Sequence, residues 1–179
     1  MEKKLNFLYS SVHGAYWVYY GVISSFSSVF LLARGFSNSQ IGIIIALANI
    51  LAVIIQPYLA DYVDRSRRTA IFSVMASMCI ALVLFTNIIL VAKNHVVLGF
   101  FYVAAFMLQS VMQPFCNGLN RVLEDGGNKI YFGFCRSIGS LVYSIVVVAL
   151  GYMVDSYTVD IIPKAGILTT LVLLIVVWF

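Results

Sequence analysis

Residues 40–68 read QIGIIIALANILAVIIQPYLADYVDRSRR, and this stretch decides the fold class. Its first part, residues 40–63, is almost entirely apolar, and a helix needs about 20 such residues to cross the bilayer core. Its last part contains an acidic residue and a basic cluster, at Asp64, Arg65, Arg67 and Arg68. A long apolar run that ends in arginines is typical of a transmembrane helix whose end faces the cytoplasm.

The same alternation of apolar runs and charged breaks continues along the whole chain. Of its 179 residues, 62% are hydrophobic and 10% are charged, whereas soluble domains have about 45–50% apolar and about 25% charged residues. The apolar runs cover about residues 7–33, 40–63, 69–92, 96–119, 131–154 and 165–179. The sequence therefore predicts one all-α membrane domain over residues 1–179, a bundle of six transmembrane helices, and excludes an ordinary soluble domain.

Lysine and arginine residues are distributed unequally between the two sides of this bundle. One side has Lys3, Lys4, Arg65, Arg67, Arg68, Arg121 and Lys129, and the other has Arg34, Lys93 and Lys164. The side richer in Lys and Arg is cytoplasmic in most membrane proteins. We therefore expect a multi-pass protein of the cytoplasmic membrane with its amino terminus in the cytoplasm.

The last apolar run is shorter than the others. Residues 165–179 would form a helix of about 22 Å, whereas the hydrocarbon core is about 30 Å thick. We therefore expect that the chain stops inside its sixth helix, and that a carboxy-terminal half or a second copy completes the protein. The lipid bilayer is its expected surrounding.

Other partners are not indicated by the residues. The basic residues form no clustered face, so no nucleic-acid partner is expected. Cys79, Cys116 and Cys135 lie inside apolar runs at spacings that match no metal or redox motif, so neither a metal nor a cofactor is expected.

Four of the six predicted helices have a polar stripe along one face. These stripes are His13, Tyr16, Tyr20, Ser24 and Ser27; Gly42, Ala46, Asn49 and Gln56; Gln109, Gln113, Cys116, Asn117 and Asn120; and Arg136, Ser140 and Tyr143. Polar residues inside membranes line solute pathways or form hydrogen bonds between helices. Taken together, the stripes favour a polar cavity surrounded by the first, second, fourth and fifth helices, with the third and sixth facing lipid. This order repeats as two three-helix units, a pattern common in transporters.

Arg136 is the most informative single residue. It lies about 9 Å into the fifth predicted helix, where a charge is costly unless it has a partner or reaches back to the surface. No Asp or Glu lies deep in any of the six runs. We therefore expect its partner to be a solute, water together with Asn117 and Asn120, or a segment outside this chain.

The loop after the second predicted helix resembles the signature of the major facilitator superfamily of transporters. Asp64, Arg65 and Arg68 fit that signature, while Ala60 and Arg67 stand where the family usually has Gly. The resemblance implies that residues 1–179 form the amino-terminal half of a twelve-helix fold and that the fitting residues form a cytoplasmic gate.

A second likeness is to the oligosaccharide–proton symporters, the lactose permease-like group. It rests on residues 37–44, on Gln56-Pro57 and on residues 132–139. The resemblance implies that Arg136 binds sugar hydroxyls and that Tyr143 stacks on a sugar ring, with protons as the coupling ion. The carboxylate that pairs with this arginine in the family falls near Asn117 here. The predicted substrate-binding residues are Arg136, Tyr143, Asn117, Gln113, Tyr20 and Asn49.

Other functions are consistent with parts of the sequence. An arginine without an acidic partner suits an organic anion as well as a sugar, and a six-helix scaffold or a half-transporter that dimerises is a further alternative. An intramembrane serine protease would need a Gly-x-Ser-x-Gly nucleophile, which the sequence lacks, so we do not expect an enzyme. His13 lies alone inside a run, and such histidines mostly pack or form hydrogen bonds.

Overall fold

The structure is a computed structural model that describes residues 2–66, 70–124 and 127–178. Every regular element in these ranges is a helix, and six of the helical segments are long and apolar enough to cross a membrane. In order, the elements are α1 (Glu2–Tyr20), η1 (Gly21–Ser25), α2 (Ser27–Ala33), α3 (Asn38–Arg65), α4 (Ala70–Val91), α5 (His95–Glu124), α6 (Phe132–Ser156) and α7 (Ile161–Trp178). The first candidate span consists of α1, η1 and α2 together. The predicted all-α class is confirmed.

Local chemistry sets where the helices begin. The Ser37 hydroxyl accepts from the Gln40 backbone N–H at 3.3 Å, and the Gln40 side chain accepts from the Ser37 N–H at 2.8 Å, so a capping box starts α3 at Asn38. The predicted start of the last helix at residue 165 is wrong, because α7 already begins at Ile161. Pro163 fits into its first turn, where a helix does not need the missing N–H.

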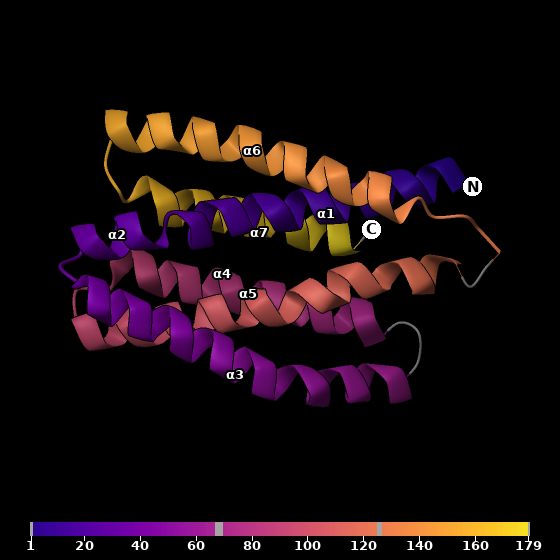
Figure 1. Cartoon of the computed structure of the whole chain (residues 1–179), viewed down its shortest axis with the longest axis horizontal. Helices are drawn as coiled ribbons and strands as arrows, with labels where there is room; N and C mark the ends of the chain where they lie inside the picture. Colours follow the sequence, from indigo (N-terminus) through magenta and orange to yellow (C-terminus); the bar gives the residue numbers. More distant parts are fainter. Residues whose placement is uncertain (1, 67–69, 125–126, 179) are drawn as a thin grey trace.

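The helices form two layers (Figure 1). One layer contains α1, α6 and α7, and the other contains α3, α4 and α5. Contacts between α4 and α7 and between α1 and α5 join the two layers. Each layer therefore combines helices from both predicted three-helix units, so the units exchange their first helices.

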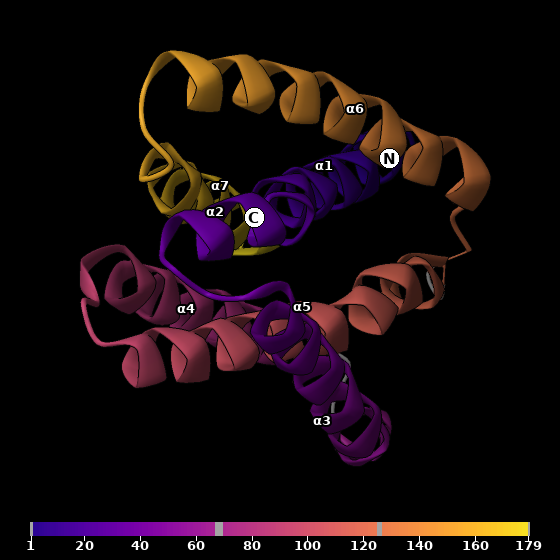
Figure 2. The same cartoon turned by 60° about the vertical axis from the view of Figure 1, so that its left-hand side comes forward.

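The second and fifth spans lie far apart, on opposite sides of the molecule (Figure 2). Few of their residues are buried: Ile41, Ile44, Ala48 and Ala52 in α3, and Cys135, Gly139 and Leu150 in α6. The four stripe-bearing helices therefore do not enclose a cavity by themselves, and the expected polar cavity between them stays a prediction. The helices α4 and α7 do not simply face lipid, since they pack closely against each other. A stripe shows which face of a helix is polar, but not which helix covers that face.

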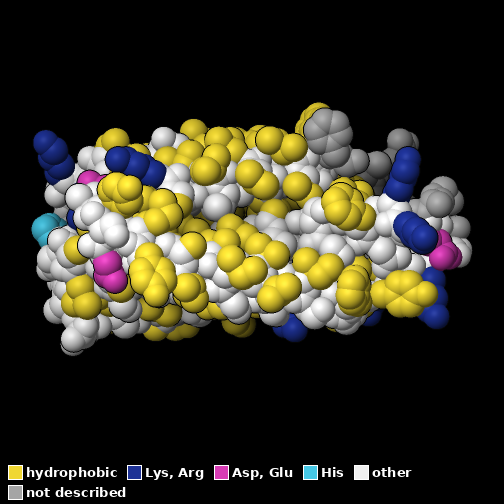
Figure 3. Space-filling view, turned by 90° about the horizontal axis from the view of Figure 1, so that it is seen from above, with side chains coloured by type: hydrophobic (Ala, Val, Ile, Leu, Met, Phe, Trp, Pro, Cys, Tyr) yellow, Lys and Arg dark blue, Asp and Glu magenta, His cyan; other side chains and the backbone are white. Residues whose placement is uncertain are grey.

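Charged side chains lie mainly at the two ends of the face seen in Figure 3, and hydrophobic side chains fill its middle. The exposed hydrophobic side chains of the molecule include Leu141, Ile145 and Val148 of α6 and Leu168 of α7. Such a belt is the surface that a helical membrane protein presents to lipid tails.

The contact between α1 and α6 depends on a glycine. A Cβ atom at Gly139 would lie 2.5 Å from Cδ1 of Trp17 and 3.2 Å from the carbonyl oxygen of His13. Only a residue without a side chain lets the two helices come this close, as is common between transmembrane helices.

Replacing Gly139 by alanine is therefore expected to destabilise the bundle by about 1–3 kcal/mol, the usual cost of overpacking. The measurement is thermal unfolding in detergent micelles. The matched control is Gly133→Ala in the same helix, where a Cβ meets nothing within 4 Å. An equal melting temperature for the two variants would contradict this account of the contact.

Candidate functional site

Three buried tyrosines connect the first span to α5. The Tyr9 hydroxyl donates to the carbonyl of Asn117 at 3.1 Å, and the Tyr16 hydroxyl donates to the carbonyl of Gln109 at 3.1 Å. In the opposite direction, the Tyr102 hydroxyl of α5 donates to the carbonyl of Ile23 at 2.8 Å. These bonds fix the height and rotation of α1 against α5.

The polar stripe of the first span is therefore a packing face. His13, Tyr16, Ser24 and Ser27 are all buried, and the Ser24 hydroxyl donates to the side-chain oxygen of Gln109 at 2.9 Å. The expectation that this stripe lines a pathway is wrong for Tyr16 and Ser24, because both form hydrogen bonds to Gln109 of α5, and such bonds between helices produce the same spacing as a wet face. Ser24 lies in η1, a π-helical segment of a kind often found at functional sites.

An open groove of about 890 Å³ runs between α3 and α5 at the end where α6 begins. We call it the α3–α5 groove. Its polar and charged lining residues are Gln56, Asp64, Asn117, Asn120 and Arg121, and Phe132 of α6 closes one side. This volume lies in the range of small-molecule sites.

A proline organises one wall of the α3–α5 groove. Pro114 lies inside α5, and because proline lacks an N–H, the carbonyl of Ser110 one turn earlier has no helical donor. The Gln56 side-chain amide of α3 donates to this carbonyl at 3.0 Å. The Ser110 hydroxyl also donates to Asn49 at 3.5 Å. Gln56 and Asn49 thus hold α3 against α5.

Arg136 lies against one aromatic ring of the first span, that of Trp17. Its guanidinium carbon is 5.7 Å from the centre of the Trp17 ring, a cation–π arrangement. The Trp17 ring lies 5.2 Å from Tyr20 and 6.2 Å from Tyr143. The Tyr143 and Ser25 hydroxyls form a hydrogen bond at 2.9 Å. We call Trp17, Tyr20, Arg136 and Tyr143 the aromatic cluster.

The predicted substrate-binding residues fall into two neighbouring places. Arg136, Tyr143 and Tyr20 meet in the aromatic cluster, and Asn117 lines the α3–α5 groove. The two remaining residues are Asn49, which faces Ser110, and Gln113, which is half-buried on α5 one turn before Asn117.

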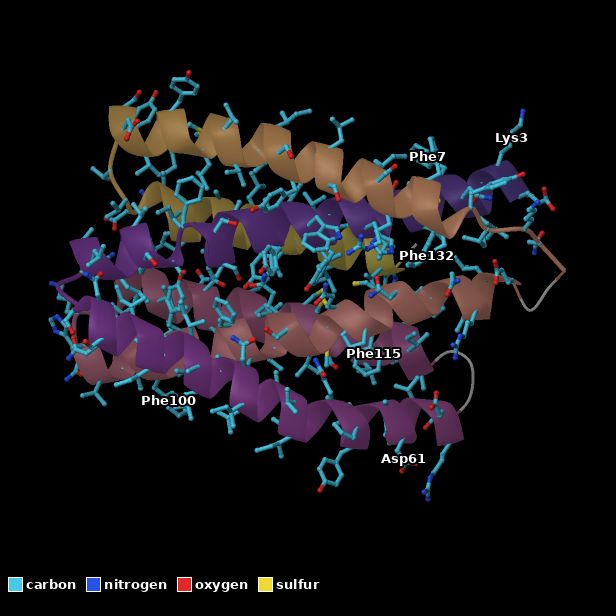
Figure 4. All side chains as sticks on the ribbon, in the orientation of Figure 1. Lys3, Phe7, Asp61, Phe100, Phe115 and Phe132 are labelled. Atoms are coloured by element: carbon cyan, nitrogen blue, oxygen red, sulfur yellow. The ribbon has the colours of Figure 1, made fainter. Side chains whose placement is uncertain are left out.

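Sequence reasoning missed Trp17 and Phe132. Phe132, which Figure 4 labels, lies one turn before Arg136 on α6 and lines the α3–α5 groove. The only sequence signal for Trp17 is its place one turn before Tyr20.

The predicted gate residues Asp64 and Arg65 have different surroundings in the structure. Asp64 lines the α3–α5 groove at its end. Arg65 instead forms an ion pair with Asp61, with Nε 2.8 Å from Oδ1, on an exposed part of α3. Arg68 lies outside the described residues. The spacing of Asp61 and Arg65, four residues apart on a helix, is the signal that could have indicated this pair.

At the opposite end of the bundle, two connections are joined by charge. Arg34, which follows α2, forms an ion pair with Asp160, which precedes α7, at 2.7 Å. The Arg34 guanidinium also lies 5.0 Å from the centre of the Phe30 ring. This ion pair ties the first connection to the last within one layer.

Two further features bear on chemistry. A second groove, of about 950 Å³, lies between α1, α6 and α7 and is lined mostly by apolar side chains such as Phe7, Ile138 and Leu168.

In the part of the chain that the structure describes, no group of three or more His, Cys, Asp or Glu side chains could hold a metal ion.

Comparison with known proteins supplies the family. The model of the MFS_1 like family matches residues 9–179. No curated protein and no solved structure matches the chain. The family points to a transporter rather than an enzyme, and with six membrane-crossing helices it describes a multi-pass membrane protein. The chain therefore belongs to the MFS_1 like family of the major facilitator superfamily.

Proposed function

We propose that this chain is part of a secondary active transporter that carries a small polar solute, a sugar, together with protons. The aromatic cluster is the observation that supports this proposal most. The Arg136 guanidinium offers a planar set of donors suited to neighbouring hydroxyl groups. The Trp17 ring beside it, and the Tyr20 and Tyr143 rings that contact Trp17, offer apolar faces suited to the C–H face of a sugar ring.

The α3–α5 groove supplies a path toward this cluster. Its amide side chains, Gln56, Asn117 and Asn120, can donate and accept hydrogen bonds in exchange for the solute's water. In this proposal the groove opens to the cytoplasm, on the same side as the amino terminus. A carboxy-terminal half or a second copy covers the open side between α3 and α6, and rocking of the two halves gives alternating access.

Transport of an organic anion is the second candidate. It is favoured by the surroundings of Arg136, whose guanidinium lies over an aromatic ring, without a carboxylate in ion-pair contact within the described residues. A carboxylate on the solute could then complete a charge-assisted pair, which is stronger than a neutral hydrogen bond.

The deciding experiment is uptake by proteoliposomes that contain the full-length protein, with a panel of methyl glycosides and organic acids. We expect uptake of a glycoside that rises with an inward proton gradient and falls when a protonophore removes the gradient. Uptake of acids alone would favour the anion transporter. No flux of either class would leave a non-transporting scaffold, or a half-transporter without its partner, and would refute the proposal.

Arg136 should be needed for binding. The variant Arg136→Gln is expected to raise the KM for uptake about 10- to 100-fold, because hydrogen bonds to a charged group contribute about 1.5–3 kcal/mol. Arg136→Lys keeps the charge but loses the planar donors, so a sugar should be bound poorly and an anion better. The control is Lys93→Gln, which removes one positive charge from an exposed connection. An unchanged KM in Arg136→Gln would contradict this role.

The two carboxylates at the end of α3, Asp61 and Asp64, should differ in their effect on the rate of uptake. Asp64 lines the α3–α5 groove, so Asp64→Asn is expected to slow uptake several-fold. Asp61→Asn removes only an exposed ion pair, with side chains 57% and 78% exposed, and such pairs contribute little. Initial uptake rates at equal protein content check this difference. Equal rates for the two variants would exclude a special role for Asp64.

A further inference from the structure

His13 has unusual surroundings for a polar side chain. It lies in the middle of α1 and only 1% of it is exposed. Within the described residues, neither Nδ1 nor Nε2 of its ring has a hydrogen-bond partner. Buried polar groups nearly always have partners, because leaving one unpaired costs its full desolvation free energy. This imidazole therefore has a donor and an acceptor that the fold does not use.

Aromatic rings surround the imidazole. The Tyr9 ring meets it edge-on at 4.7 Å between centroids, and the Phe132 ring meets it edge-on at 6.1 Å. Such contacts are weak and do not replace two hydrogen bonds. On the α6 side, Gly139 packs against the backbone of His13, so α6 brings Phe132 and Arg136 close to this turn of α1.

Phe132 connects the imidazole to the α3–α5 groove. Its ring contacts the rings of His13 and Tyr9, and the same residue lines the groove, whereas His13 is not among the lining residues. Figure 4 shows Phe132 on the inner side of α6, in the space between the two layers. Phe132 is the first residue of α6 and is 37% exposed. A partly exposed side chain at a helix end can change rotamer quickly.

We propose that His13 is a solute-binding residue that Phe132 screens from the α3–α5 groove. When the Phe132 ring turns aside, the imidazole presents one N–H and one lone pair to the groove. A solute hydroxyl both donates and accepts, so it can use both. His13 then supplies an acceptor beside Arg136, whose guanidinium only donates. This inference rests on the proposed transport of a hydroxyl-bearing solute.

The screen can be tested without knowing the solute. Diethyl pyrocarbonate acylates accessible neutral imidazole, and peptide mass spectrometry of the full-length protein in lipid nanodiscs reports each histidine separately. We expect slow modification of His13 beside rapid modification of exposed His95. In Phe132→Ala the rate at His13 should rise about tenfold or more, because the open population increases.

The matched control for the screen is Phe134→Ala. Phe134 lies on the same first turns of α6 but lines the apolar groove between α1, α6 and α7, so its loss should leave the rate at His13 unchanged. Slow modification of His13 in Phe132→Ala, or fast modification in the unchanged protein, would overturn the role of Phe132.

The binding role has its own test, with the methyl glycoside of highest uptake as the probe. That glycoside should protect His13 from modification in Phe132→Ala, an effect that a purely structural histidine would not show. His13→Leu should raise the KM about tenfold without lowering the melting temperature, because it removes unpaired buried atoms. His13→Asn, which keeps a donor and an acceptor, should recover part of the affinity.

The outcomes separate this inference from the proposed function. If no solute is taken up, the proposed function fails while the modification rates still show whether Phe132 screens His13. If a glycoside is taken up with an unchanged KM in His13→Leu and without protection of His13, the binding role of His13 is refuted and the transporter proposal stands.

Discussion

The hydrogen bonds between tyrosine hydroxyls and backbone carbonyls at the α1–α5 contact are the constraint on which the other helices depend. Inside a membrane, polar groups must find partners within the protein. A tyrosine satisfies this need at the far end of an apolar ring, so Tyr9, Tyr16 and Tyr102 can cross a packed interface. Because α6 and α7 pack on α1, and α3 and α4 pack on α5, these bonds also set the distance between the two layers.

Much of the fold could be predicted from the sequence, because membrane thickness and charge placement act locally. Residues 40–68 alone indicate a spanning helix and its end, and Ser37 with Gln40 indicates its start. The pairing of helices could not be predicted, since it depends on contacts between distant segments. Gly139 is an example: nothing in its local sequence says that Trp17 and His13 lie against it.

In the candidate site, too, features set by local sequence could be predicted, and contacts between distant segments could not. Arg136 and Tyr143 could be recognised because a charge and an aromatic ring two turns apart are unusual in an apolar helix. In the structure, Arg136 and Tyr143 of α6 both contact the Trp17 ring of α1, and Tyr143 also contacts the Tyr20 ring. In the stripe from His13 to Ser27, the predicted contact with a solute pathway is wrong at Tyr16 and Ser24, because these two side chains form hydrogen bonds to α5. Phe132 gave no signal, since an aromatic residue at the start of a transmembrane helix is ordinary. The sequence does contain a signal for the hydrogen bond from Gln56 to Ser110, because Pro114 leaves the Ser110 carbonyl without a helical donor.

The exchange of first helices between the two layers has a consequence for biogenesis. The main neighbours of α1 are α6 and α7, and α4 packs mainly on α7 and α5. During synthesis, which proceeds from the amino terminus, the first span therefore enters the bilayer long before its partners exist. Until then the side chains of His13, Tyr16 and Ser24 face lipid or the insertion machinery, where polar groups are costly. These six helices can pack together only after α7 has been inserted, so their assembly is governed by contacts that are distant in sequence.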